Sequence, residues 1–323
     1  MSVLLGRPDD RLSLPRAVDA LRDAARRAGR PSWLWLAGVL YPSLNLNVDL
    51  LRGILALVQR VSGIEVPLAG EMGRFVTLFA PGIPGVNLGG RGEHQFELVL
   101  GLLPVLVLSY RLIVGLAKVS DPLHASSAAV LVPVEGSSAQ TERGVPLRRV
   151  WAEGKGLALM GLGLWGTLLL LLFGATLVLI GPLVALLKML DLAKFSALFA
   201  GLLLPLLVLV LAYAAVLMVV NQLALHSLAH NRRGVASALT HAWRLVRTSP
   251  LGALRATLVD LVLFVSVLLV DAVFVRNFAG DSPLSLALEL ALFGFAGVTR
   301  AGYWARTYRA LGGLSSSDNV PGL

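Results

Sequence analysis

The fold of this chain is decided by residues 195–224, which read FSALFAGLLLPLLVLVLAYAAVLMVVNQLA. This run of 30 residues contains no Asp, Glu, Lys or Arg. About 20 consecutive apolar residues are enough for an α-helix to cross the hydrocarbon core of a bilayer, where every backbone polar group must be bonded within the segment. The stretch therefore predicts a transmembrane helix.

Four other stretches are also long and apolar enough to be predicted spans. They are residues 96–118, 156–187, 254–276 and 283–304. A sixth candidate, residues 33–51, is weaker because its apolar start is followed by Pro42, Asn45 and Asp49. The sequence thus predicts an all-α fold, a polytopic transmembrane helix bundle of about six spans with amphipathic interfacial helices.

The composition favours a membrane protein and excludes several other classes. Of 323 residues, 56% are hydrophobic and 15% are charged, whereas soluble domains have about 25% charged residues. These fractions argue against a soluble globular protein, a disordered chain and a nucleic-acid-binding module. The chain has no cysteine, which removes disulfides, thiolate metal sites and cysteine nucleophiles. We expect no cofactor and no bound metal.

The basic residues indicate the topology. With six crossings and the N-terminus inside, 20 Lys and Arg residues face the cytoplasm and seven face outside, as the positive-inside rule requires. Five crossings would leave an Arg-rich end or loop on the outer side. We therefore predict a cytoplasmic amphipathic helix within residues 1–32, a transmembrane domain over 33–311 and a cytoplasmic tail over 312–323, with both termini cytoplasmic.

Three stretches have apolar side chains on one helical face and charged side chains on the rest, which is typical of helices that lie in a membrane interface. Residues 48–61 are expected on the outer side, unless they continue a kinked first span, and residues 13–30 and 234–248 are expected at the cytoplasmic face. The predicted apolar face of residues 13–30 is Val18, Leu21, Ala25 and Ala28. That of residues 234–248 is Val235, Ala238, Leu239, Ala242, Leu245 and Val246. The arginines predicted to bind anionic lipid or a partner are Arg16, Arg22, Arg26, Arg27, Arg232, Arg233, Arg244 and Arg247.

Two segments resemble a known group. Residues 231–247 read NRRGVASALTHAWRLVR, and residues 303–311 read YWARTYRAL. Together they resemble an uncharacterised bacterial group of six-helix membrane proteins, which is similar to the membrane domain of some glycerophosphodiester phosphodiesterases. The group's pattern is a short helix of the type Ala-Leu-x-x-Ser-Trp-Arg-Leu and a closing Tyr-Arg-x-Leu, and Ala242 replaces the usual Ser. The resemblance implies a multi-pass protein of the bacterial plasma (inner) membrane and carries no catalytic residue.

Four ionisable residues stand out within the predicted spans, where charges are costly and face protein or water. They are Arg111, Asp260, Asp271 and Glu289. Arg111 and Asp260 lie at similar depths, which predicts a buried ion pair between their spans. Asp271 and Glu289 share a second depth near the outer side. They could bind a cation or carry protons, or could be solvated or paired with Arg276 or Lys194, and a structural role is favoured.

Motifs of catalysis are absent from the sequence. His226 and His230 have the i, i+4 spacing of a two-histidine metal site, but no Asp or Glu occurs between Asp191 and Asp260 to supply a third ligand nearby. Histidines at an interfacial helix end are the favoured interpretation. The chain also lacks a Gly-x-Ser-x-Gly elbow and a phosphate-binding glycine loop.

These observations predict a non-enzymatic integral membrane protein, a structural or accessory subunit of a membrane complex. Its expected partners are the bilayer, anionic lipids and other membrane subunits, but not nucleic acid. Two alternatives stay open: a small transporter or channel component that uses the intramembrane charges, and a membrane-embedded lipid-handling protein. The first would bring the charges together on a water-accessible cavity, whereas a structural role would pair them between helices.

Overall fold

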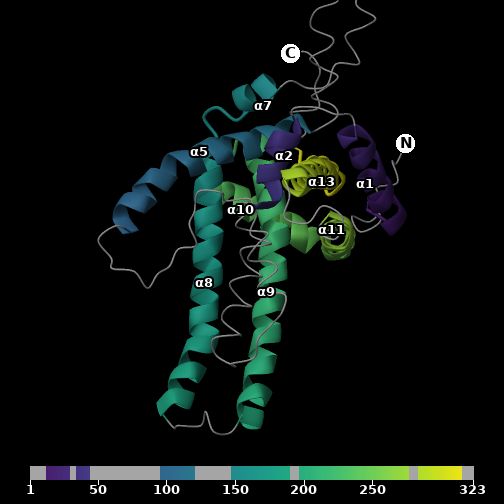
Figure 1. Ribbon diagram of the computed structural model, residues 1–323. Coiled ribbons are helices and arrows are strands. Elements are labelled where there is room, and N and C mark those ends of the chain that lie inside the picture. Colours follow the sequence, from purple (N-terminus) through teal and green to yellow (C-terminus); the bar gives the residue numbers. More distant parts are fainter. Residues whose placement is uncertain are drawn as a thin grey trace, which may run out of the picture. The chain divides into compact units, whose positions relative to one another are not determined.

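The structure is a computed structural model that describes residues 12–29, 34–43, 95–120, 147–189, 196–275 and 283–314 (Figure 1). Regular structure in these ranges is helical throughout, without strands. The residues fall into two compact units. The first unit takes in residues 1–42, 92–163 and 222–323, and the second takes in 43–91 and 164–221.

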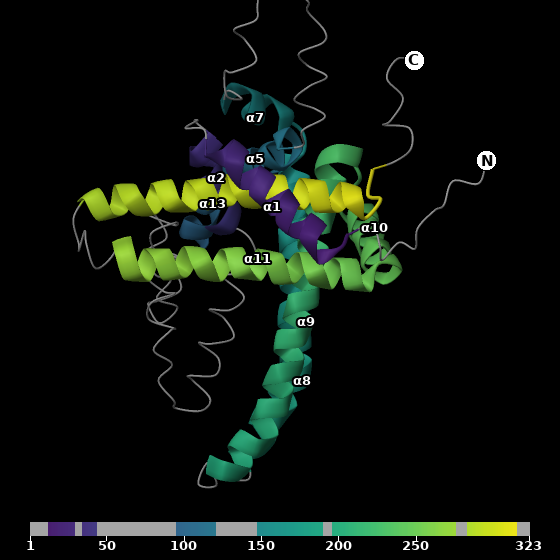
Figure 2. The same cartoon turned by 90° about the vertical axis from the view of Figure 1, so that its right-hand side faces the viewer.

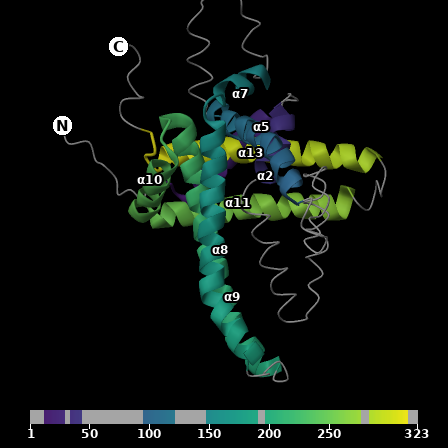
Figure 3. The ribbon, with the colours of Figure 1, turned by 90° about the vertical axis from the view of Figure 1, so that its left-hand side faces the viewer.

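Two antiparallel helices form the centre of the first unit. They are α11 (Pro250–Val270) and α13 (Pro283–Ala310), which lie side by side in Figures 2 and 3. Contacts between Ala256 and Tyr303 and between Asp260 and Arg300 fix their antiparallel register. Each helix begins with a proline, whose fixed φ and missing N–H suit a first helical turn. The π-helix η4 (Asp271–Val275) continues α11.

The N-terminal helix α1 (Leu14–Ala28) packs obliquely on α13 and runs antiparallel to it, and α1 also contacts α11 (Figure 2). Ala24 lies beside Gly302, and Arg306 Nη1 donates to the Asp23 carboxylate at 2.9 Å. At the start of α1, Arg255 Nη1 donates to the carbonyl oxygen of Leu12 at 3.2 Å. The start of α1 therefore lies at the end of the pair where α11 begins and α13 ends.

The next helix, α2 (Leu34–Ser43), runs parallel to α13. Trp35 packs against Gly294, and Gly38 packs against Gly297 so closely that a Cβ on Gly297 would overlap the carbonyl oxygen of Gly38. Trp35 Nε1 donates to the carbonyl oxygen of Ala28 at 2.9 Å, so α1 and α2 form a closed hairpin on α13.

The remaining helices of the first unit surround these elements. They are α5 (Gln95–Val119), α7 (Leu147–Glu153), the first turn of α8 (Ala158–Met189), the last turns of α9 (Ser196–Asn231) and α10 (Val235–Thr248). α5 contacts α7 and α13, and α10 contacts α11. α13 ends at Ala310, and the chain turns at Gly312, whose φ of +84° suits glycine.

The described part of the second unit is the remainder of α8 and α9, which run antiparallel in Figure 1. Pro182 and Pro205 lie inside these helices. Proline is tolerated within membrane helices because neighbouring groups satisfy the freed backbone carbonyls.

The helices agree closely with the segments that the sequence predicts. The five strong spans correspond to α5, α8, α9, α11 with η4, and α13, while residues 13–30 and 234–248 correspond to α1 and α10. Of residues 33–51, the structure describes Leu34–Ser43 as α2, and residues 48–61 lie outside the described residues. The all-helical fold is thus confirmed for the part that is described.

Membrane-spanning character is supported for two or three segments. Val208–Asn231 and Pro250–Val267 are long and apolar enough to cross a membrane. Leu147–Glu153 and Ala158–Leu172 would form a third span together, with a bend of 73° between them. These segments come from the described residues alone, and they fit a membrane location.

Candidate functional site

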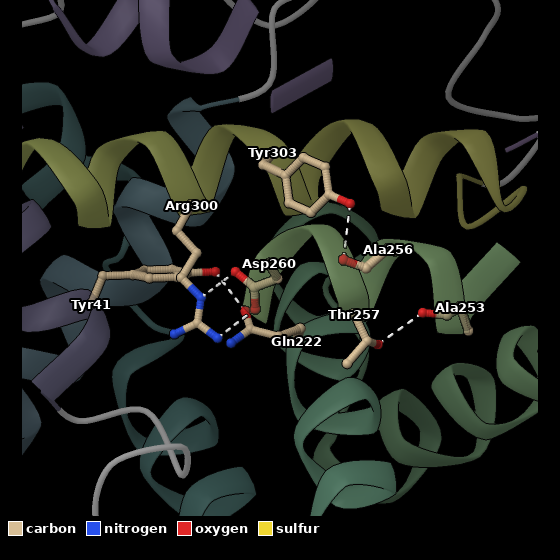
Figure 4. Close-up of polar contacts among 8 residues, drawn as sticks. All are labelled: Tyr41, Gln222, Ala253, Ala256, Thr257, Asp260, Arg300 and Tyr303. Carbon is tan, nitrogen blue, oxygen red and sulfur yellow. Dashed lines mark hydrogen bonds and ion pairs between the residues drawn. The ribbon is translucent and has the colours of Figure 1, made fainter. Parts of the chain in front are cut away.

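The most distinctive site is an ion pair buried between the two central helices. Arg300 Nε donates to Asp260 Oδ1 at 2.7 Å, and Arg300 Nη2 donates to Asp260 Oδ2 at 2.6 Å (Figure 4). The Arg300 side chain is 6% exposed and that of Asp260 is 8% exposed. This two-bond geometry matches the planar guanidinium to both carboxylate oxygens, which is the strongest form of such a pair.

Polar groups from four helices gather around this pair. Tyr41 of α2 donates its hydroxyl proton to Gln222 Oε1 of α9 at 2.8 Å, and Tyr303 donates to the carbonyl oxygen of Ala256 at 3.0 Å (Figure 4). Tyr303 lies one turn beyond Arg300 on α13, and Ala256 lies one turn before Asp260 on α11. The antiparallel register therefore aligns both contacts, and the cluster joins α2, α9, α11 and α13.

The ion pair suits a structural role because each of its two charges is neutralised by the other. Two buried charges are stable only when their geometry is good, and loss of one partner costs roughly 3–5 kcal/mol. Both oxygens of the Asp260 carboxylate accept from Arg300, so the carboxylate is already neutralised. We interpret the pair as a lock that fixes the register of α11 and α13.

The predicted pairing of Asp260 with Arg111 is wrong. Arg111 Nε donates to the carbonyl oxygen of Trp151 at 2.9 Å, and its guanidinium lies 3.9 Å from the centroid of the Trp151 ring. A similar depth in the membrane does not show which helices are neighbours. The helix that lies beside α11 and carries an arginine at the level of Asp260 is α13, and the arginine is Arg300. Arg300 is one of the 20 basic residues that the predicted topology places at the cytoplasmic face, although it lies inside the predicted span 283–304.

Arg111 instead helps to join α5 to α7. About two helical turns further along α5, Lys118 Nζ donates to Glu153 Oε2 at 2.6 Å. Gly154 is required beside Arg111, because a Cβ there would overlap the Arg111 carbonyl oxygen. A cation stacked on an indole ring and a largely buried ion pair therefore hold this contact.

The second predicted pair of charges is described only in part. Asp271 is 2% exposed and begins the π-helix η4. Glu289 is a residue of α13, but its side chain lies outside what the structure describes. The shared depth of Asp271 and Glu289 therefore stays a prediction.

Three histidines of α9 and α10 lie around Tyr308 of α13. The rings of His226 and His230 stack with centroids 5.7 Å apart, and each lies 6.2 Å from the Tyr308 ring. His241 Nε2 donates to the carbonyl oxygen of Gly313 at 3.1 Å. Within the described ranges, no three His, Asp or Glu side chains are placed to hold a metal ion together. The arrangement anchors the chain after α13 onto α9 and α10.

The predicted basic surfaces lie on α1, on α10 and in the short loop before α10. Arg16, Arg22, Arg26, Arg27, Arg232, Arg244 and Arg247 are exposed, and Arg233 is half-buried. On α10 the buried side chains are Ala238, Ala242 and Leu245, all from the predicted apolar face. On α1 the predicted face is shifted, because Ala17, Ala24 and Ala28 are buried while Val18 is 48% exposed. The small alanines allow α1 to approach α13 closely at Gly302.

Sequence reasoning missed Arg300, Tyr41, Gln222 and Tyr303. A signal existed only for Arg300, which lies four residues inside the end of a predicted span. The other three are ordinary residues of apolar segments until packing brings them together. No protein-family model, curated protein or solved structure matches this chain.

Proposed function

We propose that this chain is a non-enzymatic integral membrane protein that acts as a structural or accessory subunit of a membrane complex. The proposal includes six membrane spans, both termini on the cytoplasmic side, and a location in the bacterial plasma membrane. The bilayer and other membrane subunits are its partners.

The observation that carries the proposal is the pairing of charges between helices. Asp260 is neutralised by Arg300, and Arg111 stacks on Trp151. A transport pathway needs charged groups that an ion or proton can reach, whereas a scaffold needs charges that fix helix contacts. Within the described residues, these two contacts favour a scaffold.

The subunit role is tested by purification from the native membrane in a mild detergent. We expect a stable complex whose other subunits stay bound to the wild-type chain. The double variant Asp260→Leu/Arg300→Met, which keeps helix packing, is expected to keep those partners. A chain that is recovered alone and monomeric from its own membrane would contradict the proposal.

The six-span topology is tested with single cysteines, because the chain has none of its own. Ser62→Cys is expected to react with a membrane-impermeant maleimide in intact cells. Ser137→Cys and Ser237→Cys are expected to react only after the membrane is opened. Labelling of Ser237→Cys in intact cells would overturn the orientation.

A transporter or channel component is the second candidate, and buried Asp271 at the start of a π-helix favours it. Single π-turns in helices occur frequently at functional sites. The test is proton flux into liposomes that contain the purified chain, with Asp271→Asn compared with the wild type. Flux that the variant abolishes would support transport, and wild-type liposomes as tight as empty ones would exclude proton conduction.

A further inference from the structure

α1 begins, and α10 lies, at the end of the central pair where α11 begins and α13 ends. Leu12, just before α1, accepts from Arg255 near the start of α11, and Arg306 near the end of α13 binds Asp23. α10 ends directly before α11, and its His241 donates to Gly313 just after α13. Figures 2 and 3 show α10 where α11 begins and α13 ends, and Figure 2 shows α1 crossing toward the same end. The start of α1 and the helix α10 therefore lie at the same end of the central pair.

Around each of the two helices, a buried inner face, an exposed apolar strip and a basic face follow one another. On α1 the inner face consists of alanines, and at about 100° per residue a strip beside it holds Leu14, Val18 and Leu21. Leu14 is 50% exposed and Val18 is 48% exposed. Arg22 and Arg26 follow next around the helix and are exposed. Apolar side chains outside the core thus lie directly beside cations.

α10 repeats this plan. Its inner face is Ala238, Ala242 and Leu245. At about 100° per residue, the strip beside that face includes Leu239 and Trp243, and Trp243 is 48% exposed. Arg244 and Arg247 continue around the helix and are exposed. Unlike α1, which also carries Asp19 and Asp23, residues 232–247 contain no Asp or Glu.

A strip of aliphatic or indole side chains bordered by arginines matches the chemistry of an anionic membrane surface. Trp is favoured at the boundary between headgroups and acyl chains, and arginine binds phosphate oxygens through two parallel bonds. Helices with this division of faces bind the headgroup region of a membrane, and anionic lipid strengthens their binding. In water without a membrane, the apolar strips of α1 and α10 would stay in contact with solvent.

We propose that α1 and α10 form a two-helix anchor that seats this end of the protein on anionic phospholipid. Leu14, Val18 and Trp243 enter the boundary between headgroups and acyl chains. Arg22, Arg26, Arg244 and Arg247 bind the lipid phosphates. The inference deepens the proposed function, because it requires the chain to be an integral membrane protein and specifies which surface meets which lipid.

The test uses the full chain in nanodiscs with a fluorescent probe on single cysteines. Val18→Cys on the apolar strip is compared with its neighbour Asp19→Cys on the outer face, and Trp243→Cys with Thr240→Cys. Brominated lipid is expected to quench the probe at the two strip positions and not at the two outer positions. Equal quenching within each pair would overturn the proposal.

The lipid preference is tested in nanodiscs of phosphatidylcholine with and without phosphatidylglycerol. We expect phosphatidylglycerol to increase quenching at Val18→Cys, and changing Arg22, Arg26, Arg244 and Arg247 to Gln to abolish the increase. The same four positions changed to Lys keep the charge and are expected to keep the increase. Quenching that ignores phosphatidylglycerol would overturn the lipid assignment.

Two further outcomes separate this inference from the proposed function. A chain that resists alkaline carbonate extraction but shows no strip quenching refutes the anchor and leaves the integral protein standing. A chain that carbonate extracts refutes both. Strip cysteines that are shielded from a water-soluble maleimide in native membranes but reactive in nanodiscs would assign this face to a protein partner instead.

Discussion

The Arg300–Asp260 lock makes a quantitative prediction about stability. Asp260→Leu would leave the Arg300 guanidinium, which is 6% exposed, without its carboxylate. An uncompensated buried charge costs roughly 3–5 kcal/mol, whereas replacing both partners with apolar residues is often neutral. We therefore expect Asp260→Leu and Arg300→Met each to lower the free energy of unfolding by about 3–5 kcal/mol. The double variant should recover most of that loss.

The assay is reversible unfolding of the purified chain in mixed micelles with increasing SDS, followed by circular dichroism. The matched control is Arg111→Met, alone and combined with Asp260→Leu. Because Arg111 contacts Trp151 and not Asp260, the two losses should add to within about 0.5 kcal/mol. A double variant at 260 and 300 as unstable as the sum of its single variants would refute the lock. Strong coupling between positions 111 and 260 would instead restore the pairing inferred from depth.

Three further predictions concern titratable groups and close helix contacts. Partial burial lowers the pKa of His241 below its ordinary value, so the folded state favours the neutral ring. The neutral His241 ring therefore contributes fully to the stability of the fold above about pH 6.5. This contribution is lost as the pH falls through the lowered pKa. The melting temperature should fall on acidification, and His241→Gln should reduce that dependence. Gly297→Ala should cost about 1–3 kcal/mol in chemical unfolding because its Cβ meets the backbone of α2, whereas Gly166→Ala, which meets nothing within 4 Å, should cost nothing. The hydrogen bond and the charge of Arg306 hold the pKa of Asp23 below its ordinary value, so Asp23→Asn should speed hydrogen exchange in α1, and unchanged exchange would show that the contact does not hold α1.

Local signals predicted the individual helices well. The segment 234–248 was predicted from apolar spacing, and the structure has α10 at Val235–Thr248. Residues 13–30 became α1 at Leu14–Ala28, with proline in the first turn and Gly29 after the last. Capping residues, proline positions and helical periodicity act within a few residues, so they can be read along the chain without knowing the neighbours.

Only one of the two residues of the buried ion pair could be predicted from the sequence. Asp260 was recognised because a carboxylate in an apolar run needs a partner. Its partner was not, since Arg300 is 40 residues away and the choice between Arg111 and Arg300 depends on which helix lies beside α11. The same limit applies to α1, where periodicity allowed several inner faces and the close approach to Gly302 selected the alanines.

What the sequence alone determined is the class of molecule: an all-helical chain with apolar segments long enough for a membrane, scarce internal charges and two basic amphipathic helices. These properties follow from composition and from spacings of three and four residues, which are local. Only the tertiary structure decided that Asp260 binds Arg300, that Arg111 stacks on Trp151, and which strips of α1 and α10 stay uncovered. Those outcomes depend on the register of helices far apart in sequence, and register is set by the packing of small residues such as Gly38, Gly297 and Gly302 against a neighbouring helix.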